Sequence, residues 1–293
     1  NFLSTYDDEA PENFFSSHKL KQVLRYGENP HQEANFYINS GSEGAGITSA
    51  EQIQGKELSY NNIADTDAAI ECVSNFEKPS CVIVKHANPC GVASGKTLLE
   101  AYEKAFSCDE TSAFGGIIAL NKALDKFTAK KIIDNQFVEV IAAPAINPAA
   151  KKIIARKKNV RLLLVKDLFQ KPTGFKTLTM NQGILVQNVD DGAVSKKDLK
   201  VVTKKKPTSK QVNDALFAWR VGKYVKSNAI VYAKNNMTLG IGAGQMSRID
   251  SAEIAVSKAK KAGFNLKGAT MASDAFFPFR DSIDEAAKNG IQC

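Results

Sequence analysis

The chain has 293 residues, enough for about two domains, and its 43% hydrophobic and 24% charged residues are ordinary for a water-soluble globular protein. Its mean hydropathy is −0.24 and its longest apolar runs, 82–84 and 162–165, are strand-sized, which excludes a membrane protein. The net charge of +8 favours anionic partners. The five cysteines include no CxxC pair, which excludes a disulfide framework and indicates a reducing cytoplasm.

The first part of the chain is predicted to alternate helices with short apolar strands. An irregular acidic opening precedes it. Helices are expected over 65–76, 97–106, 125–135 and 148–157. Strands are expected over 81–84, 116–120, 138–142 and 160–165, with a loop over 86–95. Helices of about ten residues between strands of about five indicate an α/β fold around a buried sheet.

The second part of the chain shows the same alternation. A less regular stretch with a proline, glycines and a lysine triplet separates the two parts, so we predict domains over 1–200 and 201–293. Helices are expected over 211–226, 253–261 and 282–289, and strands over 229–232, 238–241 and 268–271. Because the sequence stops where another strand is due, we expect the C-terminal element of the second domain to be truncated.

Three pairs of segments suggest an internal duplication. The segment 82–88 resembles 229–235, and Gly91–Gly95 resembles 240–244. The separation within the second pair is two positions larger than within the first. A third pair is 112–114 and 274–276. In this alignment Lys85 and His86 correspond to Tyr232 and Ala233. The duplication therefore predicts one reacting half and one mainly binding half, with chance similarity of short apolar stretches as the alternative.

Lys85 and His86 are the first candidates for chemistry. An imidazole with an ordinary pKa of about 6.5 can accept a proton at neutral pH. A neighbouring ammonium keeps the ring unprotonated and can stabilise a developing oxyanion. Adjacent residues of a strand face opposite sides, so both can serve one site only if the backbone leaves strand geometry, which Pro89 and Gly91 favour. The alternative is a structural histidine.

Other motifs have both a structural and a functional interpretation. The segment 25–32 is either a structural loop or an anion clamp around Arg25. The glycine run 240–244 resembles a dinucleotide fingerprint with the wrong spacing. The aromatic cluster 276–279 is either core or the wall of a pocket for a flat ring.

Two further function classes compete with a metal-free enzyme. His86 and Cys90 invite comparison with zinc-dependent deaminases, but the general-acid glutamate and the second cysteine of that motif are missing. The lysine runs 151–158 and 204–206 could serve a nucleic-acid-binding module, but no aromatic residues interleave with them. We therefore expect no zinc, no specific nucleic acid, and solvated faces at these lysines.

Seven segments together resemble one enzyme family: 25–32, 58–69, 84–91, 112–116, 227–234, 240–248 and 272–281. They are similar to the transformylase part of the bifunctional purine biosynthesis family. This family pairs the formyltransferase acting on 5-aminoimidazole-4-carboxamide ribonucleotide (AICAR) with IMP cyclohydrolase. The resemblance runs from about Arg25 to the C-terminus, and several of its motifs are long and unusual.

The resemblance implies a fold and a reaction. The fold would be two tandem cytidine-deaminase-like α/β subdomains without zinc. The reaction would transfer the formyl group of 10-formyltetrahydrofolate, a co-substrate, to the 5-amino group of AICAR. The family further implies a cytoplasmic homodimer with active sites at the subunit interface. The cyclohydrolase half that precedes this region in the family is expected to be absent, as is the stretch beyond Cys293.

The resemblance also implies roles for individual residues. His86 would be the proton acceptor and Lys85 the stabiliser of the transition state. The nucleotide would be held by a larger set: Arg25, Tyr26, Phe114, Gly115, Asn228, Arg248 and Asp281. Ile249 and Phe276 would line the folate side. Glu139 stands where the family commonly has an aspartate, so a carboxylate remains there with a different reach.

Overall fold

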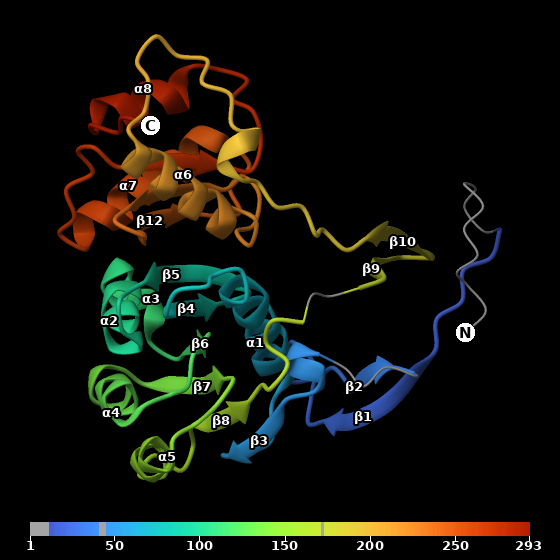
Figure 1. The fold of residues 1–293 in the computed structure, drawn as a ribbon. Coiled ribbons are helices and arrows are strands. Elements are labelled where there is room, and N and C mark those ends of the chain that lie inside the picture. Colours follow the sequence, from blue (N-terminus) through green and yellow to red (C-terminus); the bar gives the residue numbers. More distant parts are fainter. Residues whose placement is uncertain (1–11, 41–44, 171–172) are drawn as a thin grey trace.

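In the computed structural model, residues 12–40, 45–170 and 173–293 are described, and they are built around one nine-stranded mixed sheet (Figure 1). Its strand order is β13-β11-β12-β5-β4-β6-β7-β8-β3. The first six strands in chain order are β3 (Glu51–Gln54), β4 (Ser80–Lys85), β5 (Asn88–Ser94), β6 (Gly116–Leu120), β7 (Val138–Ala143) and β8 (Arg161–Leu164). The remaining three are β11 (Ile230–Lys234), β12 (Met237–Gly242) and β13 (Thr270–Ser273). The expected α/β class is confirmed.

Helices cover both faces of this sheet. They are α1 (Tyr60–Val73), α2 (Leu98–Cys108), α3 (Glu110–Ala113), α4 (Lys126–Asn135), α5 (Pro148–Ile154), α6 (Ser209–Gly222), α7 (Arg248–Lys261) and α8 (Asp281–Lys288). Alternate residues of β4 point to opposite faces: Val82 packs in one core with α1 and α6, and Ile83 packs in another with α2. A third core lies between α7, α8 and strands β11–β13. No helix of the described residues is long and apolar enough to cross a membrane.

The two halves of the chain repeat one order of elements. The first unit runs α1-β4-β5-α2-β6-α4 and the second runs α6-β11-β12-α7-β13-α8, with α3 inserted in the first. Strands β5 and β12 pair antiparallel and join the units into one sheet. A Cβ added at Gly91 would stand 1.9 Å from the carbonyl oxygen of Ala105, and one at Gly240 would stand 2.0 Å from that of Ala255. In each unit, therefore, glycine lets a helix backbone approach the second strand of a hairpin.

The structure corrects the predicted register of the duplication. The turns of the two hairpins, His86-Ala87 and Asn235-Asn236, lie 149 positions apart, and all four residues have positive φ. Lys85 therefore corresponds to Lys234, and His86 to Asn235, rather than to Tyr232 and Ala233. The third pair of segments is also wrong, because 112–114 precede β6 whereas 274–276 follow β13. The stretch expected as the loop 86–95 is a two-residue turn followed by strand β5.

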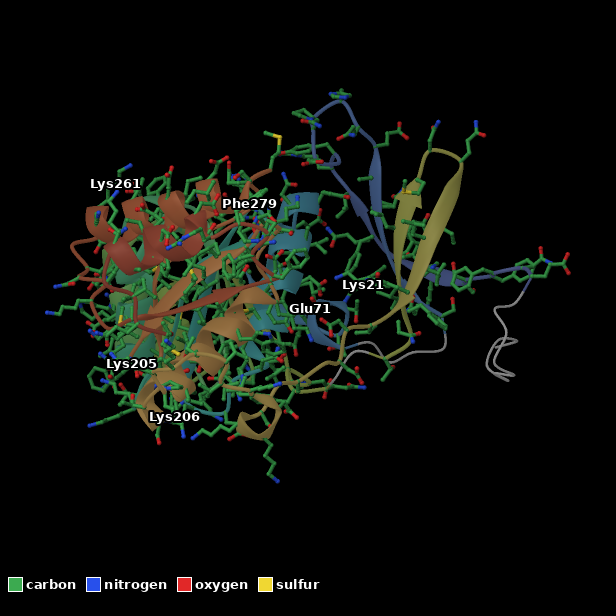
Figure 2. The ribbon with its side chains drawn as sticks, turned by 90° about the horizontal axis from the view of Figure 1, so that it is seen from above. Lys21, Glu71, Lys205, Lys206, Lys261 and Phe279 are labelled. Carbon is green, nitrogen blue, oxygen red and sulfur yellow. The ribbon has the colours of Figure 1, made fainter. Side chains whose placement is uncertain are left out.

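Two hairpins extend from the same side of the body (Figures 1 and 2). They are β1 (His18–Leu24) with β2 (Ala34–Asn39), and β9 (Phe175–Met180) with β10 (Gly183–Asn188). The first was expected to be irregular and the second falls in the predicted boundary region. Leu24 anchors the first hairpin in the core of α1, whereas every residue of β9 and β10 is exposed. The second structural unit begins with α6 at Ser209.

Candidate active site

One edge of the sheet collects the ends of strands from both units. Strand β4 ends there at Lys85, the antiparallel β6 begins there after Gly115, and β11 begins there after Asn228. Because β12 is antiparallel to both β5 and β11, its carboxyl end and Arg248 lie at this edge too. We call this region, comprising residues 85–88, 114–115, 226–228 and Arg248, the His86 edge.

The Lys85 side chain is held by backbone carbonyl groups at this edge. Its ammonium Nζ donates hydrogen bonds of 3.1 Å to the carbonyl oxygens of Phe114 and Gly115. Gly115 has a φ of 68°, and a Cβ added there would stand 3.1 Å from Nζ. An ammonium has three donors, so these two bonds fix its position and leave a third donor for a ligand.

His86 and Ala87 form the tight turn between β4 and β5. Their φ angles are 51° and 54°, so the backbone leaves strand geometry directly after Lys85, as predicted. Asp65 of α1 accepts both amide hydrogens of this turn: Oδ1 is 2.7 Å from the nitrogen of Ala87, and Oδ2 is 3.2 Å from that of His86. The His86 side chain is exposed, while its backbone is held from the α1 side of the sheet.

The pKa of Asp65 reflects this position. Partial burial raises it above its ordinary value, although the hydrogen bonds from Ala87 and His86 and the nearby charges of His86 and Lys85 act in the opposite direction. The carboxylate thus lies close to both candidate catalytic residues.

The second unit contributes an ordered polar cluster to the same edge. Asn88, two residues after His86, accepts a hydrogen bond of 2.9 Å from the Lys226 amide through Oδ1. Asn228, two residues after Lys226, accepts a hydrogen bond of 2.8 Å from the guanidinium of Arg248 through its own Oδ1. The candidate residues Asn228 and Arg248 are therefore in direct contact and are linked to the His86 turn through Asn88.

Arg248 is the first residue of α7 and is largely buried. Its Nη1 donates to the Asp274 carboxylate and, at 2.6 Å, to Ser273 Oγ, and its guanidinium lies 5.9 Å from the centre of the Phe277 ring. Burial by itself raises the pKa of Asp274, but hydrogen bonds from Ser227 and Arg248 outweigh it and hold the pKa below its ordinary value. Ser251, expected to precede this helix, lies within it and donates to the Asn228 carbonyl oxygen.

Phe114 and Glu139 lie on the first-unit side of this edge. Phe114 is 64% exposed and packs against Phe137 with ring centres 5.5 Å apart. Glu139, near the start of β7, accepts a hydrogen bond of 2.8 Å from Asn62 at the beginning of α1. These exposed ring faces and the carboxylate are available to a ligand at the strand ends.

The remaining predicted site residues make local contacts. The Arg25 guanidinium lies over the Tyr26 ring, 4.7 Å from its centre, in the loop of the β1–β2 hairpin. Ile249 packs partly into the third core, and Phe276 is 81% exposed. Asp281, the first residue of α8, accepts a bond from the Ser282 amide. The structure thus places Lys85, Asn228 and Arg248 at one edge of the sheet, and among the described residues no hydrogen bond or ion pair joins these five residues to them.

The geometry does not favour the zinc or dinucleotide interpretations. Among the described residues, no three His, Cys, Asp or Glu side chains are grouped to hold a metal ion. The thiol of Cys90 is buried and lies 3.4 Å from the Ile83 carbonyl oxygen. Gly240 and Gly242 belong to β12 and allow α7 to pack closely, so close packing accounts for these two glycines of the run.

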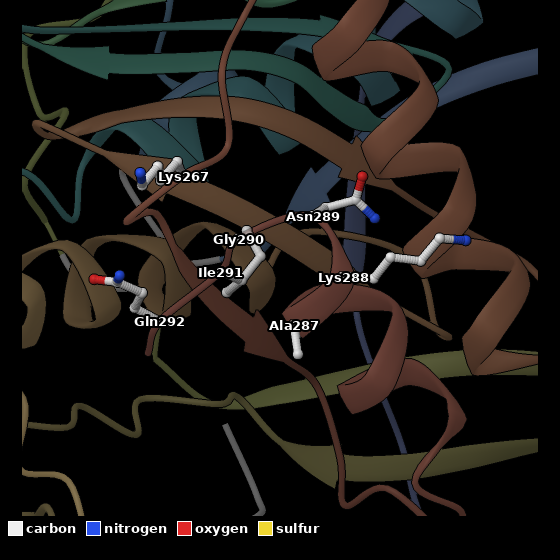
Figure 3. Close-up of a pocket in the computed structure, with 7 residues that line it drawn as sticks. All are labelled: Lys267, Ala287, Lys288, Asn289, Gly290, Ile291 and Gln292. Carbon is white, nitrogen blue, oxygen red and sulfur yellow. The ribbon is translucent and has the colours of Figure 1, made fainter.

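The matching place in the second unit keeps the lysine and loses the histidine. Lys234 Nζ donates to the Lys267 carbonyl oxygen at 2.7 Å, and the Gly268 amide donates to Gly290 at 2.8 Å, as Gly115 does to Phe137 at the same distance. A hollow borders this place, lined by Lys267 and 287–292 (Figure 3). Only the first unit combines the held lysine with an imidazole, because Asn235 replaces His86.

The lysine runs lie on the surface. Lys205 and Lys206 are exposed on the body, away from the two hairpins (Figure 2). The lysines of 151–158 are exposed as well, as expected for solvated faces.

Asp65 and Asn88, which form hydrogen bonds at the His86 turn, and Asp274, which accepts a hydrogen bond from Arg248, were not among the predicted site residues. Asp65 lies in the 58–69 segment, where nothing local distinguishes it from Asp67. The sequence does contain a signal for Asp65, because Asp214 stands at the equivalent position of the second unit. This correspondence becomes visible only in the corrected register of the duplication.

The sequence of the chain matches a model of a protein family. This family model, described as AICARFT/IMPCHase bienzyme, covers residues 1–258, which are most of the chain and include the whole His86 edge. Asp274, Phe276 and Asp281 lie outside the matched range.

Proposed function

Since the chain belongs to the AICARFT/IMPCHase bienzyme family, an enzyme family of purine biosynthesis that includes a formyltransferase, we propose that it transfers a formyl group from 10-formyltetrahydrofolate to the 5-amino group of AICAR. The observation that carries the proposal is the Lys85 ammonium, fixed by the Phe114 and Gly115 carbonyls next to the exposed His86 turn. This is a base and a cation on adjacent residues, held where the backbone leaves the strand.

The chemistry of the acceptor explains why both groups are needed. The 5-amino group is conjugated with the imidazole ring and its carboxamide, so it is a weak nucleophile that must lose a proton as it attacks. We propose that His86 takes this proton. The formyl oxygen gains negative charge in the same step, and the free donor of the Lys85 ammonium would stabilise it.

The proposed transfer forms one bond and breaks one. A bond forms between the amino nitrogen and the formyl carbon, and the bond from that carbon to N10 of the folate breaks when the tetrahedral intermediate collapses. The proton taken by His86 goes to N10 as it leaves. No oxidant or metal ion is required.

We propose that side chains of both units bind the ribonucleotide. Arg248, whose guanidinium is fixed by Asp274 and Asn228, has the forked geometry that suits phosphate oxygens. Phe114 offers an exposed ring face for a planar heterocycle, with Gly115 beside it. Arg25, Tyr26, Glu139 and Asp281 are further proposed nucleotide contacts, and Ile249 and Phe276 proposed folate contacts.

We further propose a homodimer with active sites at the interface. The exposed hairpins carry apolar side chains that one copy leaves in water: Leu20, Val23 and Tyr37 on the first, and Leu178, Ile184 and Leu185 on the second. Burial of these side chains against a second copy would explain hairpins that extend from the body. Light scattering on the chain and on the Leu178→Lys/Leu185→Lys variant tests this. We expect the mass of a dimer for the wild type and half that mass for the double variant.

The decisive experiment replaces the two catalytic residues and their counterparts in the second unit. His86→Ala and Lys85→Met should each lower formyl transfer at least about 100-fold, a magnitude typical of a general base or an oxyanion donor. Asn235→Ala and Lys234→Met are matched controls, since they place the same new side chains in the matching turn and strand. Binding of AICAR, followed by calorimetry, should survive in all four variants.

The proposal fails if His86→Ala keeps most of the wild-type rate. It also fails if the control variants lose as much activity as the His86 and Lys85 variants, because the effect would then reflect fold stability.

A further inference from the structure

We infer that Asp65 is a positioning residue, which holds the His86–Ala87 turn in the conformation that presents the His86 ring. This inference rests on the proposed function for its kinetic consequence, but not for its structural one. Asp65 lies on α1, 21 positions before His86 in sequence, and its two carboxylate oxygens accept the two amide hydrogens of the turn.

The turn needs such support because of its residue types. Both central residues have φ above 50°, a region that glycine enters freely, that asparagine and histidine enter more often than most residues, and that alanine enters at a cost. A two-residue hairpin with both φ positive favours Asn-Gly. His-Ala is a poor sequence for this turn, so an external acceptor that binds both amides shifts the balance toward it.

The second unit provides the comparison. Asp214 lies 149 positions after Asp65, on the matching helix α6, and its Oδ1 accepts the amide hydrogen of Asn236 at 3.0 Å. The matching turn is Asn235-Asn236, whose residues tolerate positive φ by themselves. Equivalent aspartates therefore support both turns, but only the first turn contains a residue, Ala87, that disfavours positive φ.

The two aspartates also differ in their surroundings. Asp214 is 4% exposed and makes one bond to its turn, whereas Asp65 is half-buried, makes two, and feels the charges of Lys85 and His86. Asp65 does not touch the imidazole in any hydrogen bond of the described residues. Asp65 therefore acts on the orientation of the His86 ring through the backbone of the turn, whose conformation sets the direction of the side chain.

The test compares Asp65→Asn with Asp214→Asn. The amide keeps the shape of the carboxylate but replaces one acceptor oxygen with a donor that faces an amide hydrogen, so one of the two bonds at the His86 turn is lost. We expect Asp65→Asn to lower kcat for formyl transfer by about 10- to 100-fold, as for a misplaced catalytic group, with little change in KM for AICAR. Asp214→Asn should keep kcat within about twofold, although it lowers thermal stability.

A rescue variant separates positioning from general stability. Glycine at position 87 adopts positive φ without cost, so Ala87→Gly in the Asp65→Asn background should recover a large part of kcat. It also keeps the test usable if Asp65→Asn alone folds poorly. Equal kcat in Asp65→Asn and the wild type would overturn the inference, and so would a double variant that regains stability but no activity.

A spectroscopic readout makes the inference independent of the reaction. The chain has three histidines, so the ring signals of His86 can be assigned by their loss in His86→Asn. Asp65→Asn should shift or broaden the His86 signals and leave those of His18 and His31 unchanged, and Asp214→Asn should move none of them. If the wild type transfers no formyl group, the proposed function fails, while unchanged His86 signals in Asp65→Asn overturn the positioning role.

Discussion

Asp109 and Lys258 join the two structural units through an ion pair of 2.7 Å between Oδ2 and Nζ. Asp109 follows the end of α2 and Lys258 lies on α7. Asp109 also accepts hydrogen bonds from the amide and hydroxyl groups of Ser112, and its side chain is 12% exposed. The pair links the helices on either side of the β5–β12 contact, so it stabilises the joint between the units.

This pair predicts a pH-dependent stability. Burial by itself raises the pKa of Asp109, but the hydrogen bonds from Lys258 and Ser112 outweigh it, so the pKa is lower in the folded state. The stabilisation is therefore present above the ordinary pKa of 3.8 and is lost as the pH falls through the lower folded-state value. Lys258→Met should cost about 1 kcal/mol of unfolding free energy at pH 7, because Lys258 is partly exposed, and less at pH 3.

Urea unfolding at the two pH values measures this difference. Lys260→Met, an exposed position on the same helix, is the control and should change little at either pH. A cost for Lys258→Met that stays constant from pH 7 to pH 3 would contradict the role given to Asp109.

Gly115→Ala should damage catalysis more than stability. Alanine at a φ of 68° costs about 1 kcal/mol, and its Cβ would stand 3.1 Å from Lys85 Nζ, so the ammonium must move. Gly268→Ala carries the same backbone cost at a φ of 76°, with its Cβ 3.8 Å from Lys234 Nζ. We expect similar losses in melting temperature, but a fall in formyl-transfer rate of about tenfold only for Gly115→Ala. Similar rates in the two variants would argue against Lys85 as the stabilising cation.

Gly240→Ala should strongly destabilise the second unit. Its Cβ would fall 2.0 Å from the Ala255 carbonyl oxygen, which is part of a helix backbone and cannot rotate away. A cost of about 3 kcal/mol is expected for such overpacking, measured as the free energy of unfolding in urea. Gly183→Ala, on the exposed strand β10 with open space around it, should have almost no effect. Equal stability of these two variants would mean that α7 does not pack on β12 as described.

Asp274→Asn should weaken binding of the ribonucleotide. The substitution removes the carboxylate that fixes the Arg248 guanidinium and accepts from Ser227. We expect KM for AICAR to rise about tenfold, with a smaller change in kcat, because a charge-assisted hydrogen bond is lost from a binding group. Asp250→Asn removes the same charge two residues from Arg248 and is the control. A larger effect of Asp250→Asn than of Asp274→Asn on KM would refute the assignment of Arg248.

Local sequence predicted most elements of the central sheet. The continuous apolar run 116–120 is strand β6, and the side chains of Asp125 and Thr208 cap the N-termini of helices α4 and α6 by accepting amide hydrogens. These signals are local, since periodicity and capping depend on neighbouring residues. Strand β5 was missed because Pro89 and Gly91 indicate a turn. In the structure Gly91 lies within β5, and its lack of a side chain allows the backbone of α2 to pack closely against the strand.

The sequence by itself determined the α/β class, the apolar strands and the pairing of a lysine with a histidine at the end of one of them, because these depend on residue type and local spacing. Tertiary structure decided the register of the duplication and which side chains share an edge of the sheet. The reason is that strand order and helix approach are long-range contacts: Asp65 reaches the His86 turn, and Lys226 reaches Asn88, only after distant segments have packed together.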